Sequence, residues 1–130
     1  MRPMKFLLAA ALGFGLGLAP ALAASEQPFT PTAFEAAQKA GKVILVDVTA
    51  NWCPTCTVQK SILDKLTADP AYRDITILSV NFDTQKDVLR MFGVRSQSTL
   101  IAFRGVAEQG RSVGDTNPAS IRALLDMARG

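Results

Sequence analysis

The chain has 130 residues, a formal net charge of +3 and only two cysteines, and it contains no histidine. This length suits one domain, and the lack of histidine excludes Ser-His and Cys-His nucleophilic sites together with zinc sites that use histidine. Its charged residues are scattered rather than clustered, so no nucleic acid partner is expected.

The N-terminal segment has the features of a secretory signal peptide. Residues 1–5 are basic, residues 6–18 are apolar apart from glycine, and Ala21-Leu22-Ala23 has the small-x-small pattern that signal peptidase reads. We predict cleavage after Ala23, with Ala24 as the alternative. An uncleaved anchor is less favoured because the apolar run is shorter than the roughly 20 residues of a spanning helix.

The sequence therefore predicts a signal peptide at 1–23 and one domain at 24–130, located in the periplasm or otherwise exported. Arg2 and Lys5 both lie in the signal peptide, so its removal lowers the net charge from +3 to +1. The basic character of the whole chain owes much to this leader.

The first predicted elements of the domain are a helix and a buried strand. A short polar lead-in at 24–28 is expected to be mobile. Thr32 and Glu35 have capping-box spacing, which predicts a helix from there to about residue 40. Residues 43–48 are β-branched and apolar at nearly every position, a pattern typical of a strand buried on both faces.

The rest of the chain continues this alternation. Pro54 suits the first position of a helix that carries apolar residues at helical spacing to about residue 67. Strands are predicted at 75–82 and 99–103, a short helix at 84–92, an antiparallel strand at 106–113, and a last helix capped by Asn117. This order predicts an α/β domain with a central mixed β-sheet flanked by helices.

The cysteines, Cys53 and Cys56, are separated only by Pro54 and Thr55. A disulfide between them closes too small a loop to join distant parts of a fold, so its purpose must be chemical. Cys53 at a helix start would have its thiolate favoured by free amides and the helix dipole, which predicts the attacking, solvent-facing cysteine. Cys56, one turn further along, would resolve the mixed disulfide. The alternative is an inert small disulfide.

With the motif Trp52-Cys53-Pro54-Thr55-Cys56 between a buried strand and a helix, the chain resembles the thioredoxin superfamily. Residues 81–83 and 92–95 also match that family in order and spacing. Residues 46–53 are most similar to the C-terminal thioredoxin-like domain of bacterial membrane thiol:disulfide interchange reductases. Pro54-Thr55 is also similar to the dipeptide of thioredoxin-like proteins of cytochrome c maturation.

This resemblance implies a thioredoxin fold and a thiol:disulfide oxidoreductase, and it favours a reductant over an oxidant. Its redox group would be the Cys53–Cys56 disulfide, with no other cofactor and no metal. Expected partners are protein or small-molecule disulfides and a membrane electron-donor protein, and the expected state is a monomer.

The resemblance also assigns roles to further residues. Asp47 lies within the apolar strand, and the family's buried acid there assists proton transfer at the inner cysteine; burial should raise its pKa. The alternative for Asp47 is an exposed strand-end carboxylate. The predicted substrate-binding residues are Trp52, Pro54, Thr55, Gln97, Ser98 and Thr99. Trp52 would shield the disulfide or simply pack against the domain.

Two departures from the family pattern stand out. Ser98 occupies the slot of a cis-proline that faces the active site, and the family pairs substrate with the backbone just before it, here Gln97. Because a non-proline cis bond costs about 3–4 kcal/mol, this loop is predicted to be either strained or trans. Ser79 stands where thioredoxins often carry a lysine near the buried acid.

A binding function is the competing hypothesis. Two thiolates in this spacing suit soft metals such as Cu(I) or zinc, and a small Ser98 could leave room for one. Two cysteines without histidine fill only half of a tetrahedral site. A redox-inactive adaptor is the third alternative.

Overall fold

The computed structural model describes residues 13, 15, 17 and 24–130. The predicted signal peptide falls almost entirely outside these described residues. In the part of the chain that is described, no helix is both long and apolar enough to cross a bilayer.

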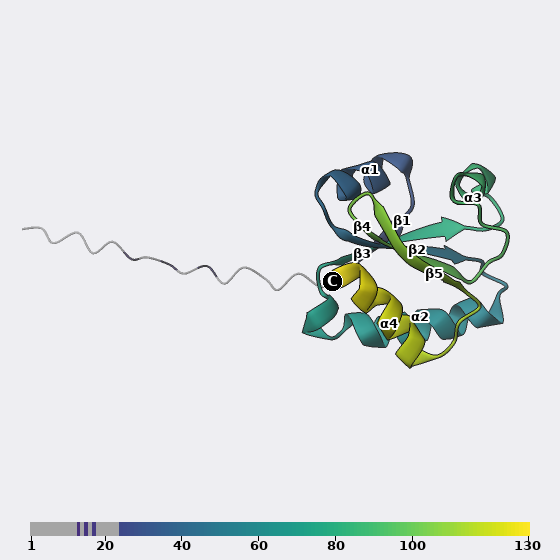
Figure 1. Cartoon of the computed structure of the whole chain (residues 1–130). Coiled ribbons are helices and arrows are strands. Elements are labelled where there is room, and N and C mark those ends of the chain that lie inside the picture. The colour runs from purple at the N-terminus through teal and green to yellow at the C-terminus, as the bar shows by residue number, and fades with distance from the viewer. Residues whose placement is uncertain (1–12, 14, 16, 18–23) are drawn as a thin grey trace, which may run out of the picture.

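The domain is a five-stranded sheet with helices on both faces, as the sequence predicts (Figure 1). Its elements in chain order are β1 (Ser25–Pro28), α1 (Pro31–Lys39), β2 (Val43–Thr49), α2 (Pro54–Thr67), the 3-10 turn η1 (Pro70–Tyr72), β3 (Ile75–Asn81), α3 (Lys86–Phe92), β4 (Thr99–Arg104), β5 (Ala107–Val113) and α4 (Pro118–Arg129). The strand order is β1-β3-β2-β4-β5, with β1, β3 and β2 parallel and β4 and β5 antiparallel.

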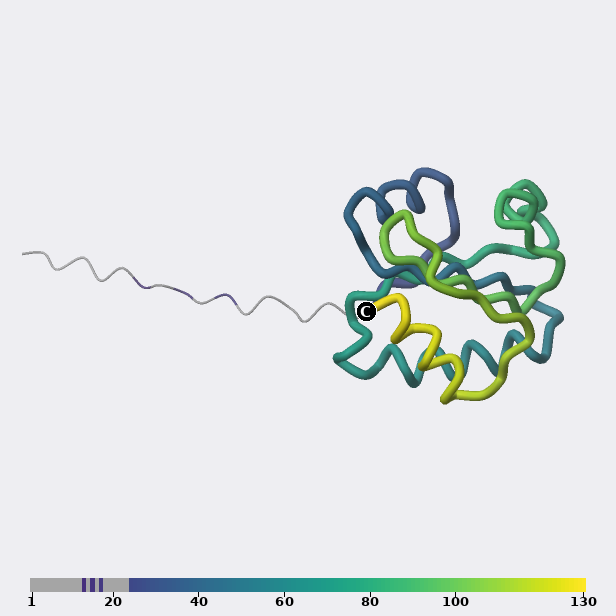
Figure 2. Tube along the Cα trace, viewed as in Figure 1, coloured from purple at the N-terminus to yellow at the C-terminus, as the bar shows by residue number. Residues whose placement is uncertain are grey.

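The sheet separates two apolar cores. Helices α1 and α3 lie on one face and α2 and α4 on the other, as the chain trace in Figure 2 shows. Phe29, Phe34 and Phe103 belong to the first core, and Leu63, Leu100 and Leu125 belong to the second. Strand β2 contributes to both because it is central and apolar on both faces, as its sequence predicts.

Two predictions for the N-terminal region are wrong. The polar lead-in is not mobile but forms β1, which adds to the sheet edge with Glu26 opposite Ile77. The N-cap of α1 is Thr30 rather than Thr32: the Thr30 hydroxyl accepts a hydrogen bond from the Ala33 amide at 3.0 Å. Pro31 explains this start, because proline is favoured at the first helical position.

Candidate active site

The two cysteines lie where β2 gives way to α2, beside the carboxyl ends of the parallel strands. Cys53 is the N-cap of α2, and its Sγ accepts a hydrogen bond from the Cys56 amide at 3.1 Å. Pro54 occupies the next position, where a missing N–H costs nothing. The helix therefore aims an unpaired backbone donor at the first sulfur, as the sequence predicts.

Both thiols are free and covered. Cys53 is 3 % exposed and Cys56 5 % exposed, so the expectation of a solvent-facing Cys53 is corrected. Asn51, Trp52 and Pro54 around it are exposed, which places Cys53 directly beneath the surface. Its sulfur is covered because the loop before β4 folds over it.

Ser98 is the residue of that loop that meets the sulfurs. Its Oγ lies 3.2 Å from Cys53 Sγ and 3.1 Å from Cys56 Sγ. The described residues contain no cis peptide bond, so of the two alternatives for Gln97–Ser98 the trans form is observed. Ser98 instead has φ +62°, a left-handed conformation that is uncommon for a residue with a side chain.

Main-chain contacts hold Ser98 in this conformation. Its N–H donates to the Val48 carbonyl at 2.8 Å, and its own carbonyl accepts from the Gly114 N–H at 2.9 Å. Gln59, buried on α2, donates through Nε2 to the carbonyls of Ser98 at 3.1 Å and Asp115 at 2.9 Å. Both partners are acceptors, which fixes the orientation of this amide group.

The environment of Cys53 favours its thiolate. Burial alone would raise the pKa, but hydrogen bonds from Cys56 and Ser98 and from the amides of Cys56 and Thr55 outweigh burial and lower it. A charged acceptor strengthens each of these bonds. The structure thus supplies the depressed pKa that a nucleophilic cysteine requires.

Asp47 lies in the middle of β2 and is 8 % exposed, so its predicted burial is confirmed. Burial, the nearby charge of Glu26 and, in the opposite direction, Lys60 together raise its pKa to about 6. Asp47 and Cys56 line the same groove of about 700 Å³ between the sheet and α2. A carboxyl with this pKa can both accept and return a proton near neutral pH.

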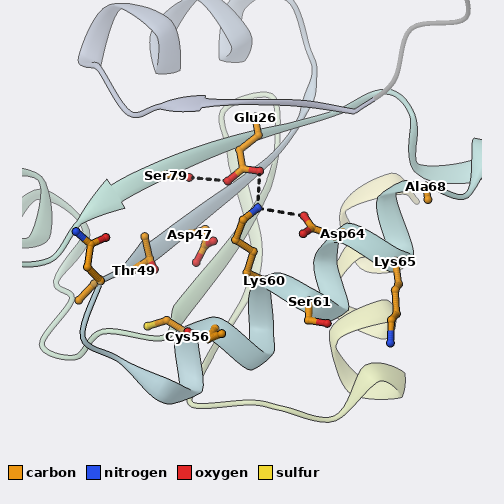
Figure 3. A pocket seen from close by; sticks show the side chains of 13 residues that line it. Glu26, Asp47, Thr49, Cys56, Lys60, Ser61, Asp64, Lys65, Ala68 and Ser79 are labelled. Carbon is orange, nitrogen blue, oxygen red and sulfur yellow. Dashed lines mark hydrogen bonds and ion pairs between the residues drawn. The ribbon is translucent and has the colours of Figure 1, made fainter.

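Glu26 and Lys60 are the residues of this groove that sequence reasoning missed. Lys60 Nζ lies 3.3 Å from Glu26 Oε2 and 3.2 Å from Asp64 Oδ1, and it extends from α2 past Asp47 toward β1 (Figure 3). Ser79 Oγ donates to Glu26 Oε1 at 3.3 Å. Lys60 on α2 therefore supplies a cation near Asp47, whereas Ser79 in the family's lysine position does not. The only sequence signal was its helical spacing, one turn after Cys56.

The remaining predicted substrate-binding residues surround the sulfurs unequally. Trp52 is 58 % exposed, and its Nε1 donates to Asp83 Oδ2 at 2.8 Å, so it is tethered at the surface rather than packed in the core. Pro54 is exposed, and Thr55 and Gln97 are half-buried. Thr99 is buried, and its hydroxyl donates to the Ser96 carbonyl at 2.7 Å. Thr99 therefore braces the loop from within.

Comparison with known proteins identifies the fold and the motif. The sequence model of the thioredoxin family matches residues 25–127. The chain belongs to the thioredoxin family. It is 36 % identical over 86 residues to the thioredoxin of Chlamydia muridarum, covering 66 % of this chain and 82 % of that protein. With the thioredoxin of Pseudomonas aeruginosa it shares 30 % identity over 88 residues, covering 68 % and 81 %.

Solved structures agree. The crystal structure of Trxlp from Edwardsiella tarda EIB202 superposes with a TM-score of 0.75 and 46 % identity, covering 78 % of this chain and 98 % of that chain. Thioredoxin from Malassezia sympodialis superposes with a TM-score of 0.72 at 20 % identity, over 83 % and 93 % of the two chains, which shows the shared fold alone. The predicted thioredoxin fold is confirmed.

As a thioredoxin, the protein is a thiol:disulfide oxidoreductase with Cys53 and Cys56 as its CxxC pair. The dithiol itself is the redox group of such an enzyme. Within the described residues, no three His, Cys, Asp or Glu side chains come together to hold a metal ion. The soft-metal hypothesis therefore gains no third ligand of these types from this part of the chain.

Proposed function

We propose that this thioredoxin is an exported reductant of disulfides. The observation that carries its chemistry is the placement of Cys53 at the N-cap of α2, with a lowered pKa, while Cys56 shares a groove with the buried Asp47. The export and the reducing direction rest on the leader pattern at 1–23 and on the resemblance to reductase domains.

The reaction begins at Cys53. Its thiolate attacks one sulfur of the substrate disulfide, the S–S bond breaks, and the other substrate sulfur leaves as a thiolate. A mixed disulfide now joins Cys53 to the substrate. One substrate sulfur is now a thiolate, and the other is still bonded to Cys53 Sγ.

Asp47 acts in the second step. Its carboxylate takes the proton of Cys56, directly or through water in the groove, and the Cys56 thiolate then attacks Cys53 Sγ. The second substrate sulfur leaves as a thiolate, and Cys53 and Cys56 become the disulfide. The net change is a substrate disulfide reduced to two thiols and the enzyme dithiol oxidised to a disulfide.

Substrate contact is assigned to the surface around Cys53, where Trp52, Pro54 and Thr55 adjoin the loop of Gln97, Ser98 and Thr99. Turnover requires a donor that reduces the Cys53–Cys56 disulfide again. For an exported protein we assign this task to a membrane electron-donor protein, and we propose that the thioredoxin acts as a monomer.

Three measurements test this function. The equilibrium potential of the Cys53–Cys56 couple against glutathione should lie in the reducing range of thioredoxins, near −270 mV, rather than near the roughly −120 mV of a periplasmic oxidant.

Cell fractionation and N-terminal sequencing should find an exported chain that begins at Ala24. A Cys56→Ser variant should capture substrates as stable mixed disulfides. An oxidising potential or a cytoplasmic full-length chain would contradict the proposal.

A further inference from the structure

We propose that the Ser98 hydroxyl is a catalytic group that donates its hydrogen bond to whichever of the two sulfurs carries the negative charge. This inference deepens the proposed thiol:disulfide exchange and rests on it. Ser98 Oγ lies almost equally far from the two sulfurs, at 3.2 Å from Cys53 Sγ and 3.1 Å from Cys56 Sγ. All three residues are buried, so no bulk water competes for these contacts.

Valence fixes the direction of the bonds in the reduced enzyme. A serine hydroxyl has one hydrogen to donate and lone pairs to accept with, whereas a thiolate can only accept. With Cys53 ionised, the Ser98 O–H points to Cys53 Sγ rather than to Cys56 Sγ. The hydrogen bond from Ser98 is one of those that lower the pKa of Cys53.

The same hydroxyl is released when Cys53 reacts. The thiolate electron pair enters the new bond to the substrate sulfur, so Cys53 Sγ becomes a neutral disulfide sulfur and a poor acceptor. When Cys56 then passes its proton to Asp47, the negative charge appears 3.1 Å from Ser98 Oγ. Rotation about one C–O bond turns the O–H from Cys53 to Cys56. The hydroxyl keeps its own proton throughout.

The loop is built to hold this oxygen in place. Ser98 adopts φ +62°, which glycine would accept more readily than serine, and its backbone is fixed to Val48, Gly114 and Gln59. A proline in this slot would carry no donor. The chain therefore places a hydroxyl where a ring would only cover the sulfurs.

A redox consequence follows. Ser98 stabilises a thiolate, and the oxidised enzyme has none, so the hydroxyl favours the dithiol over the disulfide. Removing it should raise the pKa of Cys53 and make the Cys53–Cys56 couple more reducing. Loss of a charge-assisted hydrogen bond should change both the acid dissociation constant of Cys53 and the dithiol–disulfide equilibrium constant about tenfold. For the two-electron couple, this change corresponds to ~30 mV.

The test uses Ser98→Gly and Ser98→Ala, with Ser96→Ala as the matched control. Glycine removes the hydroxyl and suits the positive φ, whereas alanine removes it and keeps the backbone strain. Ser96 lies in the same loop, and its hydroxyl contacts the Gln97 carbonyl rather than a sulfur. The readouts are the pH dependence of Cys53 alkylation, the equilibrium with glutathione, and the rate at which Cys56 releases glutathione from Cys53.

Both Ser98 variants should show an alkylation pKa about one unit higher, a glutathione equilibrium shifted about tenfold toward the disulfide, and glutathione release slowed about tenfold. Wild-type values in both variants would overturn the proposal. So would a change in Ser98→Ala alone, which would trace the effect to the backbone. Unchanged release with a shifted pKa would refute the transfer to Cys56. These readouts need no physiological substrate, so their failure is distinct from a failure of export or reducing direction.

Discussion

The backbone N–H of Ser98 donates to the carbonyl oxygen of Val48 across 2.8 Å, joining the loop before β4 to the end of β2. Proline cannot make this bond, and its ring fixes φ near −65°, far from the +62° of Ser98. We therefore expect Ser98→Pro to lower the free energy of unfolding by about 3 kcal/mol, as judged by urea denaturation. Ser98→Gly, which keeps the N–H and tolerates the φ, is the control. A proline variant as stable as wild type would mean that the loop readily adopts another backbone.

The two cysteines should differ sharply in reactivity. Cys53 has a lowered pKa at the N-cap of α2, so iodoacetamide at neutral pH should modify it much faster than Cys56. Mass spectrometry of partly alkylated reduced protein measures the ratio. In urea, where the helix is lost, the two rates should converge. Equal rates in the native protein would remove the basis for assigning Cys53 as the nucleophile.

Ionisation of the buried Asp47 carboxyl should lower the free energy of unfolding of the domain as pH rises. Its pKa is about 6 in the folded protein against 3.8 for a free side chain, so the folded state binds the extra proton between these values. Stability contributed by the protonated form is present at low pH and is lost as pH rises through about 6. The difference between the folded and free pKa values of Asp47 corresponds to at most about 3 kcal/mol in the free energy of unfolding.

Asp47→Asn should remove this dependence. We expect the variant to exceed wild type in unfolding free energy at about pH 8, with the advantage shrinking toward about pH 4. Denaturant unfolding across this range measures the difference in unfolding free energy, and Asp74→Asn, at an exposed carboxyl, should show no such trend.

Asp47→Asn should also slow the Cys56 step of disulfide reduction more than the initial Cys53 attack. Wild-type turnover across neutral pH would exclude Asp47 as the acid–base group.

Glu26 and Lys60 should move the pKa of Asp47 in opposite directions. The charge of Glu26 raises it and that of Lys60 lowers it. Glu26→Gln should therefore shift the titration of the Asp47 carboxyl, followed by carbon NMR, to lower pH. Lys60→Gln should shift it to higher pH and leave Glu26 without its ion-pair partner. Lys65→Gln is the matched control, because Lys65 lines the same groove but is not among the charges that shift the Asp47 pKa.

Helix α2 illustrates what the sequence could predict. Its observed bounds, Pro54–Thr67, agree with the prediction because both signals are local: proline at the first helical position and apolar residues at helical spacing. The strand β1 could not be found this way. Its four residues are polar or proline and all exposed, so only pairing with β3 makes them a strand.

The residues of the site likewise fall into those that a local sequence pattern could place and those that depend on distant contacts. The cysteines and Asp47 could be placed because each has a local context, a helix start or an apolar strand. The conformation of Ser98 could not, because it depends on hydrogen bonds to Val48 and Gly114, which lie elsewhere in the chain. The pair of Glu26 and Lys60 joins an edge strand to α2, and no pattern in either segment indicates the other.

Gln59 gives one more consequence of this arrangement. Its side-chain amide donates to backbone carbonyls rather than to a sulfur, and it ties α2, which carries Cys56, to the loop of Ser98 and to the turn before α4. The hydrogen bonds of one side chain thus join three segments that border the dithiol. Removing the Gln59 amide would therefore release the loop that covers both sulfurs, without altering any atom that reacts.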